Sequence, residues 1–427
     1  MMQSIIDPKI FTLIIFVLAY ALFVAFPRRR TWTAFVCAAL LILLNIISFK
    51  QAFFSINWNV MGIFFGTLVI TDLFLESRVP AYIAENIVDG AKNTAWAILF
   101  ICLLTGFISA FVENVAAVLI VAPIAFSLAS KLKINPTNMM IAIAISSNLQ
   151  GCATLIGDPP SMLLGGFAKM NFMDFFFYQG RPSIFFAVEI GAIASFVVLY
   201  FIFRGLRKKT SILKVEKVRS WVPTAILVLL VVFLALSSFF DVNFSYLAGI
   251  ICMVFGAFSV VWDRVANKKP IIRAIEKLDW DTGLFLASVF VLVGSITLSG
   301  WITIASEAAA SAIGANVAVG FFIIVAGSVL LSAFIDNVPF LAAMLPLAIH
   351  LSQTLGIASS LYLFGLLIGA SLGGNITPIG ASANIVACSL LKKEGHIVSF
   401  GEFARIGLPF TIAAVSAATA FVWFIWR

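Results

Sequence analysis

The sequence predicts an all-α polytopic membrane protein built from two inverted-topology repeats. The first observation is composition: 62% of the 427 residues are hydrophobic and 11% are charged, whereas soluble domains are ~45–50% apolar and ~25% charged. The second is a series of apolar runs long enough to cross the ~30 Å hydrocarbon core of a bilayer. The third is an internal repeat. Together they predict about ten full spans, two re-entrant helical hairpins and two interrupted helices.

The apolar runs divide the chain into two halves joined by a basic linker. The first repeat, 1–203, contains spans at 10–27, 31–49, 57–76 and 182–203, a hairpin at 93–130 and an interrupted helix at 137–170. The second repeat, 220–427, contains spans at 220–239, 243–262, 280–300 and 404–426, a hairpin at 315–352 and an interrupted helix at 358–391. The linker 204–219 is rich in Lys and Arg and is expected on the cytoplasmic side.

The internal repeat is visible in two motifs. ISAFVENVAAVLIVAPIAFSL (108–128) aligns with LSAFIDNVPFLAAMLPLAIHL (331–351), with eight of 21 positions identical and an offset of 223 residues. The same offset aligns GCATLIGDPPS (151–161) with GNITPIGASAN (374–384). Each half is expected to cross the membrane five times, and because five is odd the halves face opposite ways. Inverted repeats of this kind are typical of secondary transporters.

The net charge of +8 comes from loops rather than from a continuous basic surface, so nucleic acid is not expected as a partner. Most of the 27 Lys and Arg fall on one side of the predicted topology, which places both termini on the non-cytoplasmic side of the cell (inner) membrane. If each hairpin were instead two full spans, the loops would lie on the same sides of the membrane. The charge pattern therefore does not distinguish a hairpin from two spans. An acidic tip between apolar limbs favours re-entry, because such a tip is tolerated at depth where protein or water surrounds it.

The two interrupted helices are predicted to line a polar cavity. Pro159 and Pro160 remove backbone donors and break the first helix. Gly157 and Gly380 occupy equivalent positions and permit backbone shapes that other residues resist. Broken helices expose N–H and carbonyl groups that can bind a small polar solute or an ion. The alternative is a pair of extramembrane loops rich in Gly and Pro.

The hairpin tips carry the first candidate binding residues. Glu113 and Asp336 are equivalent by the repeat and lie where a charge is costly, so each is a functional-site hypothesis. Asn114 and Asn337 follow them and can both donate and accept hydrogen bonds. The alternative is that each acid only caps the return helix of its hairpin, and both roles can hold together.

Two further acids complete the set of proton-coupling candidates, which is Glu113, Asp158, Asp336 and Glu189. Asp158 adjoins the first break, and its repeat partner is Ala381, so the site is not symmetric. Glu189 lies inside an apolar run and is either a proton carrier or an outer-interface residue. The five Cys and two His form no ligand cluster, so no metal and no cofactor are expected. Cys152, inside GCATLIGDPPS, is an alternative candidate as a thiol ligand for the cargo.

The motif GCATLIGDPPS, with FVENVAA and FIDNVPF, resembles the ArsB/NhaD branch of the ion transporter superfamily. That branch includes arsenite pumps, silicon effluxers, some Na⁺/H⁺ antiporters and the melanosomal P protein. The resemblance covers the chain from Trp58 onward and implies inverted repeats, two hairpins and a site between them. The residues that it implies, together with those at the breaks, are Glu113, Asn114, Asn148, Thr154, Gly157, Asp158, Asp336, Asn337, Asn375, Thr377, Gly380 and Asn384. The Ser-Asn-Thr signatures of the superfamily's carboxylate carriers are not repeated in full, because the hairpins carry acids.

The acids favour a neutral or cationic cargo. No Lys or Arg lies in the core of either motif, and ionised carboxylates would repel a dianion. We therefore expect export of a small metalloid hydroxide, such as arsenite or antimonite, in exchange for protons. The alternatives are a Na⁺/H⁺ antiporter and a sodium-coupled transporter of organic or inorganic anions. Two hypotheses outside secondary transport are a channel and a membrane-embedded enzyme. The expected partners are a small inorganic solute, a coupling ion (H⁺ or Na⁺) and the lipid bilayer. The sequence is compatible with either a monomer or a homodimer.

Overall fold

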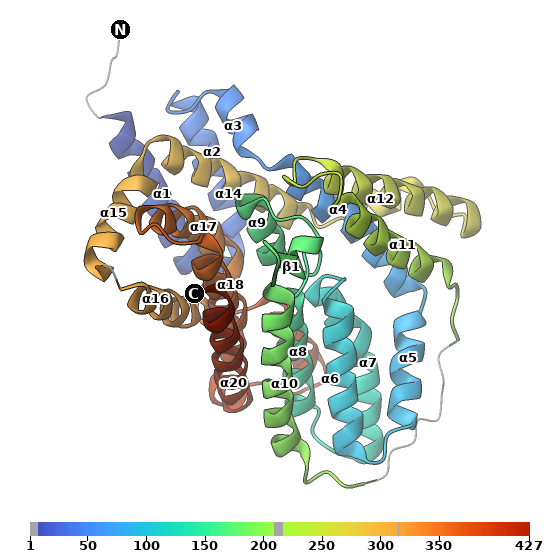
Figure 1. The fold of residues 1–427 in the computed structure, drawn as a ribbon. Coiled ribbons are helices and arrows are strands. Elements are labelled where there is room, and N and C mark those ends of the chain that lie inside the picture. The colour runs from blue at the N-terminus through green and yellow to red at the C-terminus, as the bar shows by residue number, and fades with distance from the viewer. Residues whose placement is uncertain (1–6, 209–216, 315) are drawn as a thin grey trace.

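The computed structural model describes residues 7–208, 217–314 and 316–427, and the described chain is almost entirely helical (Figure 1). One short hairpin joins β1 (Phe177–Tyr178) to β2 (Arg181–Pro182), with Tyr178 opposite Arg181. Apolar side chains from both halves form one continuous core.

The helices of the first half are α1 (Pro8–Ala25), α2 (Arg30–Leu43), α3 (Phe49–Ser55), α4 (Trp58–Glu76), α5 (Val79–Asp89), α6 (Thr94–Ser109), α7 (Asn114–Leu132), α8 (Thr137–Gly151), α9 (Pro159–Ala168) and α10 (Ile184–Phe203). Those of the second half are α11 (Val222–Ser237), α12 (Leu247–Ala266), α13 (Ile271–Glu276), α14 (Trp280–Leu298), α15 (Trp301–Ile313), α16 (Val317–Ser332), α17 (Asn337–Thr354), α18 (Ser359–Gly373), α19 (Ser382–Lys393) and α20 (Phe400–Trp426). Short 3₁₀ turns are η1 (Pro27–Arg29), η2 (Met173–Phe175) and η3 (Gly374–Ile376).

Among the described residues, eight helices are long and apolar enough to cross a membrane, or nine if the bent pair α15 and α16 forms one span. The predicted fold class of a polytopic helical membrane protein is thus confirmed. Two further apolar helices, α6 and α11, are shorter, with 16 residues each.

Three helical segments differ from the prediction. The run 31–49 is not one helix: α2 ends at Leu43, Asn45 takes a left-handed conformation (φ 53), and α3 begins at a capping box. That box is formed by Ser48 and Gln51, which satisfy each other's backbone donors. Helices α5 and α15 were not expected at all, because they are short and follow long apolar spans.

The two halves repeat the same helix order. Helices α4 to α10 correspond to α14 to α20, and α6 and α16 begin and end 223 residues apart. Even the break before the second helix is shared, since Arg78 (φ 61) and Gly300 (φ 78) are both left-handed N-caps. A shared sequence pattern has therefore produced the same local structure twice.

Contacts between α10 and α20 show that the repeats run in opposite directions. The indole of Trp426, at the end of α20, donates to Pro182 O just before α10 begins (3.1 Å). Midway along, a Cβ added to Gly191 would lie 2.9 Å from Ala414 O, its repeat equivalent. The two helices are therefore antiparallel and cross at equivalent positions, as an approximate two-fold axis requires (Figure 1).

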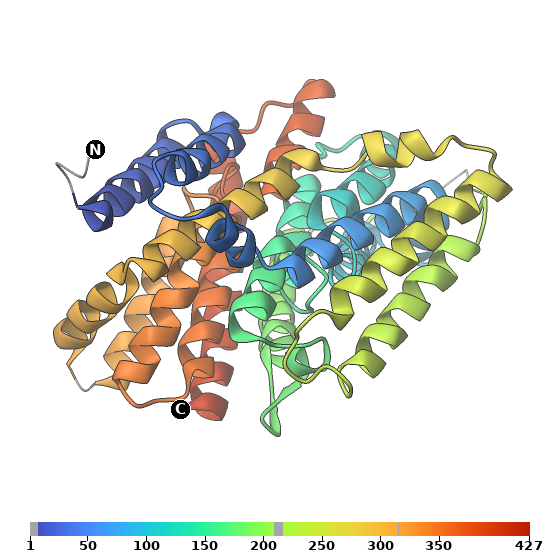
Figure 2. The same cartoon turned by 90° about the horizontal axis from the view of Figure 1, so that it is seen from above.

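The first helix of each repeat packs on a helix from the other half. Helix α4 packs on α12, and α14 packs on α2 (Figure 2). The α4–α12 contact is close because Gly66 has no side chain: a Cβ there would lie 2.3 Å from the backbone of Cys252. The Asn59 amide adds hydrogen bonds to Phe244 O (3.1 Å) and from Gly249 N (2.6 Å). The halves are thus interleaved rather than placed side by side.

Candidate functional site

Each interrupted helix is tied at its break to the hairpin of its own half. The Thr154 hydroxyl donates to Ala110 O, and the Thr377 hydroxyl donates to Ala333 O (2.5 Å). These are equivalent pairs in the repeat. Both carbonyls belong to the tips of the α6–α7 and α16–α17 hairpins, so the tips and the breaks meet inside the protein. Val112 at the first tip is 1% exposed, which excludes an aqueous loop there.

Glycines close each break. A Cβ on Gly157 would lie 2.3 Å from Gly151 O, and a Cβ on Gly380 would lie 2.5 Å from Gly374 O. Real Cβ atoms do not approach a carbonyl oxygen so closely, so only glycine fits. Asn384 stabilises the second break, because its amide donates to Gly374 O and Thr377 O (both 3.0 Å).

The N-termini of both hairpin return helices and of both helices that follow the breaks face one cavity. Glu113 caps α7 by accepting from Ala116 N (3.3 Å), Asp336 caps α17 by accepting from Val338 N (3.0 Å), and Asp158 caps α9 by accepting from Ser161 N (2.9 Å). Helix α19 begins after Ala381 without a side-chain cap. Helix N-termini carry partial positive charge and free N–H groups, so three of the four are offset by carboxylates.

The cavity has a volume of about 280 Å³ and a polar wall. Its polar lining residues are Arg30, Glu113, Asn114, Asn148, Asp158, Asp279, Asp281, Thr282, Asp336, Asn337 and Ser382. If the side chains are ionised, five carboxylates face one guanidinium. The wall is therefore acidic overall and also offers amide donors and acceptors.

Asparagines connect the two halves across the approximate two-fold axis. Asn114 accepts from the Ser109 hydroxyl (2.7 Å) and donates to Asn148 Oδ1 (3.2 Å). Asn148 in turn donates to the Ser371 carbonyl (2.8 Å) and to Asn375 Oδ1 (3.0 Å). Asn148 and Ser371 are themselves repeat equivalents. This buried chain of amides fixes how the two breaks face each other.

The twelve residues predicted for the site fall into two groups. Six line the cavity: Glu113, Asn114, Asn148, Asp158, Asp336 and Asn337. Six lie behind it and hold the backbone of the tips and breaks: Thr154, Gly157, Asn375, Thr377, Gly380 and Asn384. The second group therefore shapes the wall in this conformation rather than forming its surface.

Glu189 and Cys152 do not line the cavity. Glu189 is half-buried in the first turns of α10, beside Gln150 of α8. Cys152 is fully buried, and its thiol donates to Leu149 O (3.1 Å). In this conformation neither side chain reaches the space that a cargo would occupy.

Sequence reasoning missed the polar residues supplied by α2 and by the start of α14. Arg30 forms an ion pair with Asp336, and its guanidinium lies 5.0 Å from the centroid of the Phe285 ring. The Thr31 hydroxyl donates to Asp281 Oδ2 (2.9 Å). The motifs do lack Lys and Arg, but the cavity does not. The available signal was the triple arginine at 28–30, which is among the basic residues that set the predicted orientation.

A second hollow of about 240 Å³ adjoins the cavity and shares Glu113, Leu68 and Asp279 with it. Its wall contains Asp72, Glu76, Asp263, Lys269, Arg273 and Lys277. We call this hollow the vestibule. It leads from the cavity toward the 264–277 loop, which the charge pattern predicts to be cytoplasmic.

Ion pairs cross the vestibule. The Lys277 ammonium contacts Asp72 (2.8 Å) and Glu76 (2.9 Å), and Lys269 also pairs with Glu76. Burial disfavours the charged form of Lys277, but the carboxylates of Asp72 and Glu76 outweigh this effect and raise its pKa. Asp72 is thus part of an ion-pair network at the end of α4.

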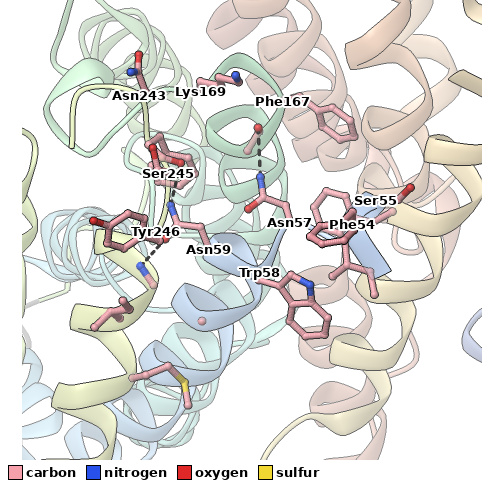
Figure 3. Close-up of a pocket in the computed structure, with 18 of the residues that line it drawn as sticks. Phe54, Ser55, Asn57, Trp58, Asn59, Phe167, Lys169, Asn243, Ser245 and Tyr246 are labelled. Atoms are coloured by element: carbon pink, nitrogen blue, oxygen red, sulfur yellow. Dashed lines mark hydrogen bonds between the residues drawn. The ribbon is translucent and has the colours of Figure 1, made fainter. Parts of the chain in front are cut away.

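A larger hollow of about 1220 Å³ lies elsewhere, between α3, α4, α9 and α12 (Figure 3). None of the twelve predicted residues lines it, and none of its described lining residues is acidic. The amides of Asn57 and Asn59 point to backbone carbonyls of Gly166 (3.3 Å) and Phe244 (3.1 Å). Its polar groups therefore hold the helices together, and we place the candidate site in the smaller acidic cavity.

A family model described as "CitMHS: Citrate transporter" matches residues 20–369, most of the chain. The chain belongs to the citrate transporter family. The matched range includes Arg30, both acidic tips and the whole first break. It follows that the protein is an integral membrane transporter, as the fold and the repeat predicted.

Several known proteins are similar to this chain over nearly its whole length. A Mycobacterium tuberculosis protein described as an uncharacterized transporter is 29% identical over 422 residues, covering 96% of each chain. A Synechocystis protein with the same description is 25% identical and covers 97% of each. The P protein of Mus musculus is 26% identical over 435 residues, covering 83% of this chain and 52% of the P protein. Similarity to the P protein was expected, whereas placement in the ArsB/NhaD branch stays a prediction.

Two solved structures share the fold. The Alcanivorax borkumensis YdaH transporter superimposes with a TM-score of 0.63 at 13% identity and covers 97% of each chain. Neisseria gonorrhoeae MtrF superimposes with a TM-score of 0.61 at 13% identity, covering 99% of this chain and 96% of its own. Both are membrane transporters, so the helix arrangement found here is one that transporters use.

Proposed function

We propose that this protein is a secondary active transporter that exports a small metalloid hydroxide, of the arsenite or antimonite kind, in exchange for protons. The observation that carries the proposal is the wall of the acidic cavity, where five carboxylates and three asparagine amides face one guanidinium. We further propose that it resides in the cell (inner) membrane with both termini outside, so that the vestibule opens to the cytoplasm.

A neutral trihydroxide fits this wall chemically. Its O–H groups can donate to carboxylates such as Glu113, and its oxygens can accept from the amides of Asn114 and Asn337. A multiply charged anion would instead meet the repulsion of several carboxylates in a site shielded from bulk water. The cargo that needs least compensation is therefore neutral or cationic.

The hairpin acids give a route for coupling. Glu113 forms no ion pair with any residue in the described chain, and it lines both the cavity and the vestibule. A carboxylate in that position can bind a proton on one side and lose it on the other as access changes. Protons moving inward would then drive the hydroxide outward, and the exchange would need no ATP.

Citrate is the second candidate, because the family description names it. Arg30 and four helix N-termini are groups that attract carboxylates. Citrate would have to enter with much of its charge neutralised by protons or by a bound cation. Sodium is the third candidate, because a cationic cargo also suits a wall rich in carboxylates.

Flux measurements in proteoliposomes test the proposal. The purified protein is supplied separately with arsenite, antimonite, citrate and sodium, under an imposed proton gradient and without ATP. Uphill movement of arsenite or antimonite driven by protons supports the proposal. Uphill citrate transport alone would replace it, and downhill flux that no gradient accelerates would indicate a channel.

A further inference from the structure

Arg30 and Asp336 form the one ion pair in the described part of the cavity, and they are 306 residues apart in the chain. Arg30 is the first residue of α2, and Asp336 is the N-cap of α17. Their side chains are 22% and 26% exposed, so the pair opens onto the cavity rather than lying in the core. It therefore occupies space and charge that a cargo would use.

The pair joins two helices, α2 and α17, that do not pack extensively on each other in the described chain. Helix α2 packs on α14, where Arg30 contacts Phe285 and Thr31 bonds Asp281. Helix α17 packs chiefly on α18, α15 and α9. It also contacts α14, and the Tyr20 hydroxyl of α1 donates to Pro339 O in its first turn (2.8 Å), so the ion pair adds to links that already exist. An ion pair between α2 and α17 stabilises the conformation in which it forms, and breaking it favours any conformation that moves the two helices apart.

The other hairpin has no such partner. Helix α12 packs on α4 as α2 packs on α14, but the first turn of α12 is Leu247, Ala248 and Gly249. The first basic residue of α12 is Arg264, in its last turn. Among the described residues, the two equivalent acids therefore have one counter-ion, Arg30, which lies outside the seven repeated helices.

We propose that Arg30 is a resident cation that occupies Asp336 while the cavity is empty, and that a proton or a cargo must displace it. The inference rests on the proposed function in taking the acidic cavity as the transport site. Neutralising Asp336 removes the attraction, so loading the site also releases the link between α2 and α17. Arg30 is thus a positioning residue that acts through Asp336 and makes the conformational change depend on cargo.

The other charged groups facing this cavity do not replace Arg30. Glu113, Asp158, Asp279 and Asp281 are all acidic. If Arg30 is neutralised, five carboxylates remain with no basic partner in the cavity wall. Asp336 then binds a proton or cation without competition, and the conformation shown here loses its ion pair.

Cysteine labelling without any cargo tests the proposal. Ser382 lines the cavity and is exposed, so Ser382→Cys reports access to it, in a background where the half-buried Cys388 is replaced by Ala. A membrane-impermeant maleimide is applied to intact cells and to inverted vesicles. In Arg30→Gln, labelling from the outside should rise about threefold relative to labelling from the cytoplasmic side, the size expected for one partly exposed ion pair.

Matched variants separate this effect from misfolding. Arg29→Gln removes the same charge from an exposed neighbour and should label like the parent. Arg30→Lys keeps a cation and should restore most of the parental ratio. If Arg30→Gln does not fold, Asp336→Asn breaks the same pair from the other side and should raise outside labelling equally. An unchanged ratio in folded Arg30→Gln or Asp336→Asn would overturn the proposal.

Transport kinetics supply a second readout. For arsenite exchanged against protons, Arg30→Gln should lower both the apparent KM and the maximal rate. Arg30 competes with the cargo for Asp336, so its loss tightens binding, and it also helps to expel the cargo, so its loss slows release. A raised KM would mean that Arg30 binds the cargo directly, which overturns the competitor role. If the parent protein does not move arsenite, the proposed function fails, whereas the cargo-free labelling still decides the role of Arg30.

Discussion

Glu113 and Asp336 are equivalent by the repeat, yet they meet different surroundings. Both cap the return helix of a hairpin and both line the cavity. Asp336 is paired with Arg30, whereas Glu113 faces the vestibule and has no ion-pair partner in the described chain. Capping and cargo binding were posed as alternatives from the sequence, and the geometry allows one carboxylate to do both, because a cap uses only one of its oxygens.

Neutralising either acid should abolish coupled transport. Glu113→Gln and Asp336→Asn keep the shape and a capping oxygen, so folding should change by about 1 kcal/mol or less. Proton-driven flux in proteoliposomes should fall to the level of empty vesicles. Glu307→Gln is the matched control, because that acid is exposed on α15 outside the cavity. Parental flux in both cavity variants would remove the proposed roles.

Asp158 has no acidic repeat equivalent, because Ala381 stands at that position. Replacing Asp158 should alter the pH dependence of transport rather than abolish it. Only one of its oxygens is satisfied by the Ser161 N–H. Asp158→Asn removes a proton-binding group from the cavity wall. The dependence of the transport rate on pH should therefore lose the contribution of one titrating group. The measurement is initial flux between pH 5 and 8 at a fixed proton gradient. A superimposable profile would show that Asp158 carries no coupled proton.

At the scale of elements, the breaks depend on close backbone approaches more than on the helices themselves. Helices α8 and α18 end within one residue of equivalent positions, and each following segment is bonded to its own hairpin tip. The Thr154 and Thr377 hydroxyls make these bonds, and glycines allow the close approach. The consequence is that four helix N-termini point into one space, although they come from four separate segments of the chain.

Adding one methyl group at a break should disturb this arrangement. Gly157→Ala places a Cβ against Gly151 O and against the hairpin carbonyls Ser109 O and Ala110 O. We expect about 1–3 kcal/mol lost from the free energy of unfolding and a large loss of flux. Thermal unfolding in detergent checks the first, and vesicle flux the second. Gly327→Ala, in α16, meets no atom within 4 Å and should behave like the parent.

For the whole molecule, the interleaved halves are what bring the missing residues to the site. Helix α2 crosses to the second half and delivers Arg30, and α14 presents Asp279 and Asp281 beside it. The vestibule then connects the cavity with the basic 264–277 loop. In the proposed orientation, the vestibule would give the cavity a route of access from the cytoplasmic side.

The interleaving should be sensitive to bulk between α4 and α12. A Cβ at Gly66 would lie 2.3–2.8 Å from three atoms of Cys252. Gly66→Ala should therefore force the two helices apart and cost about 1–3 kcal/mol, seen as a lower unfolding temperature in detergent. Gly401→Ala is the control, since nothing lies within 4 Å of its added Cβ. Equal unfolding temperatures for the two variants would show that the helices yield without cost.

The sequence by itself determined the membrane class, the two repeats, their inversion and the two acidic tips. These follow from composition and from one offset, because hydrophobic runs and duplicated motifs are local properties of the chain. It also identified Asn114, Asn148, Asp158 and Asn337, which do line the cavity.

Only the tertiary structure decided which polar residues share one space. The short helices α5 and α15 lack a span-like pattern, and the contact of Arg30 with Asp336 joins positions 306 residues apart. Nor did the motifs distinguish residues that face the cavity from Thr154 or Asn384, which hold backbone behind it. A side chain's surroundings depend on how whole helices pack, and that packing depends on contacts between parts of the chain that no local pattern relates.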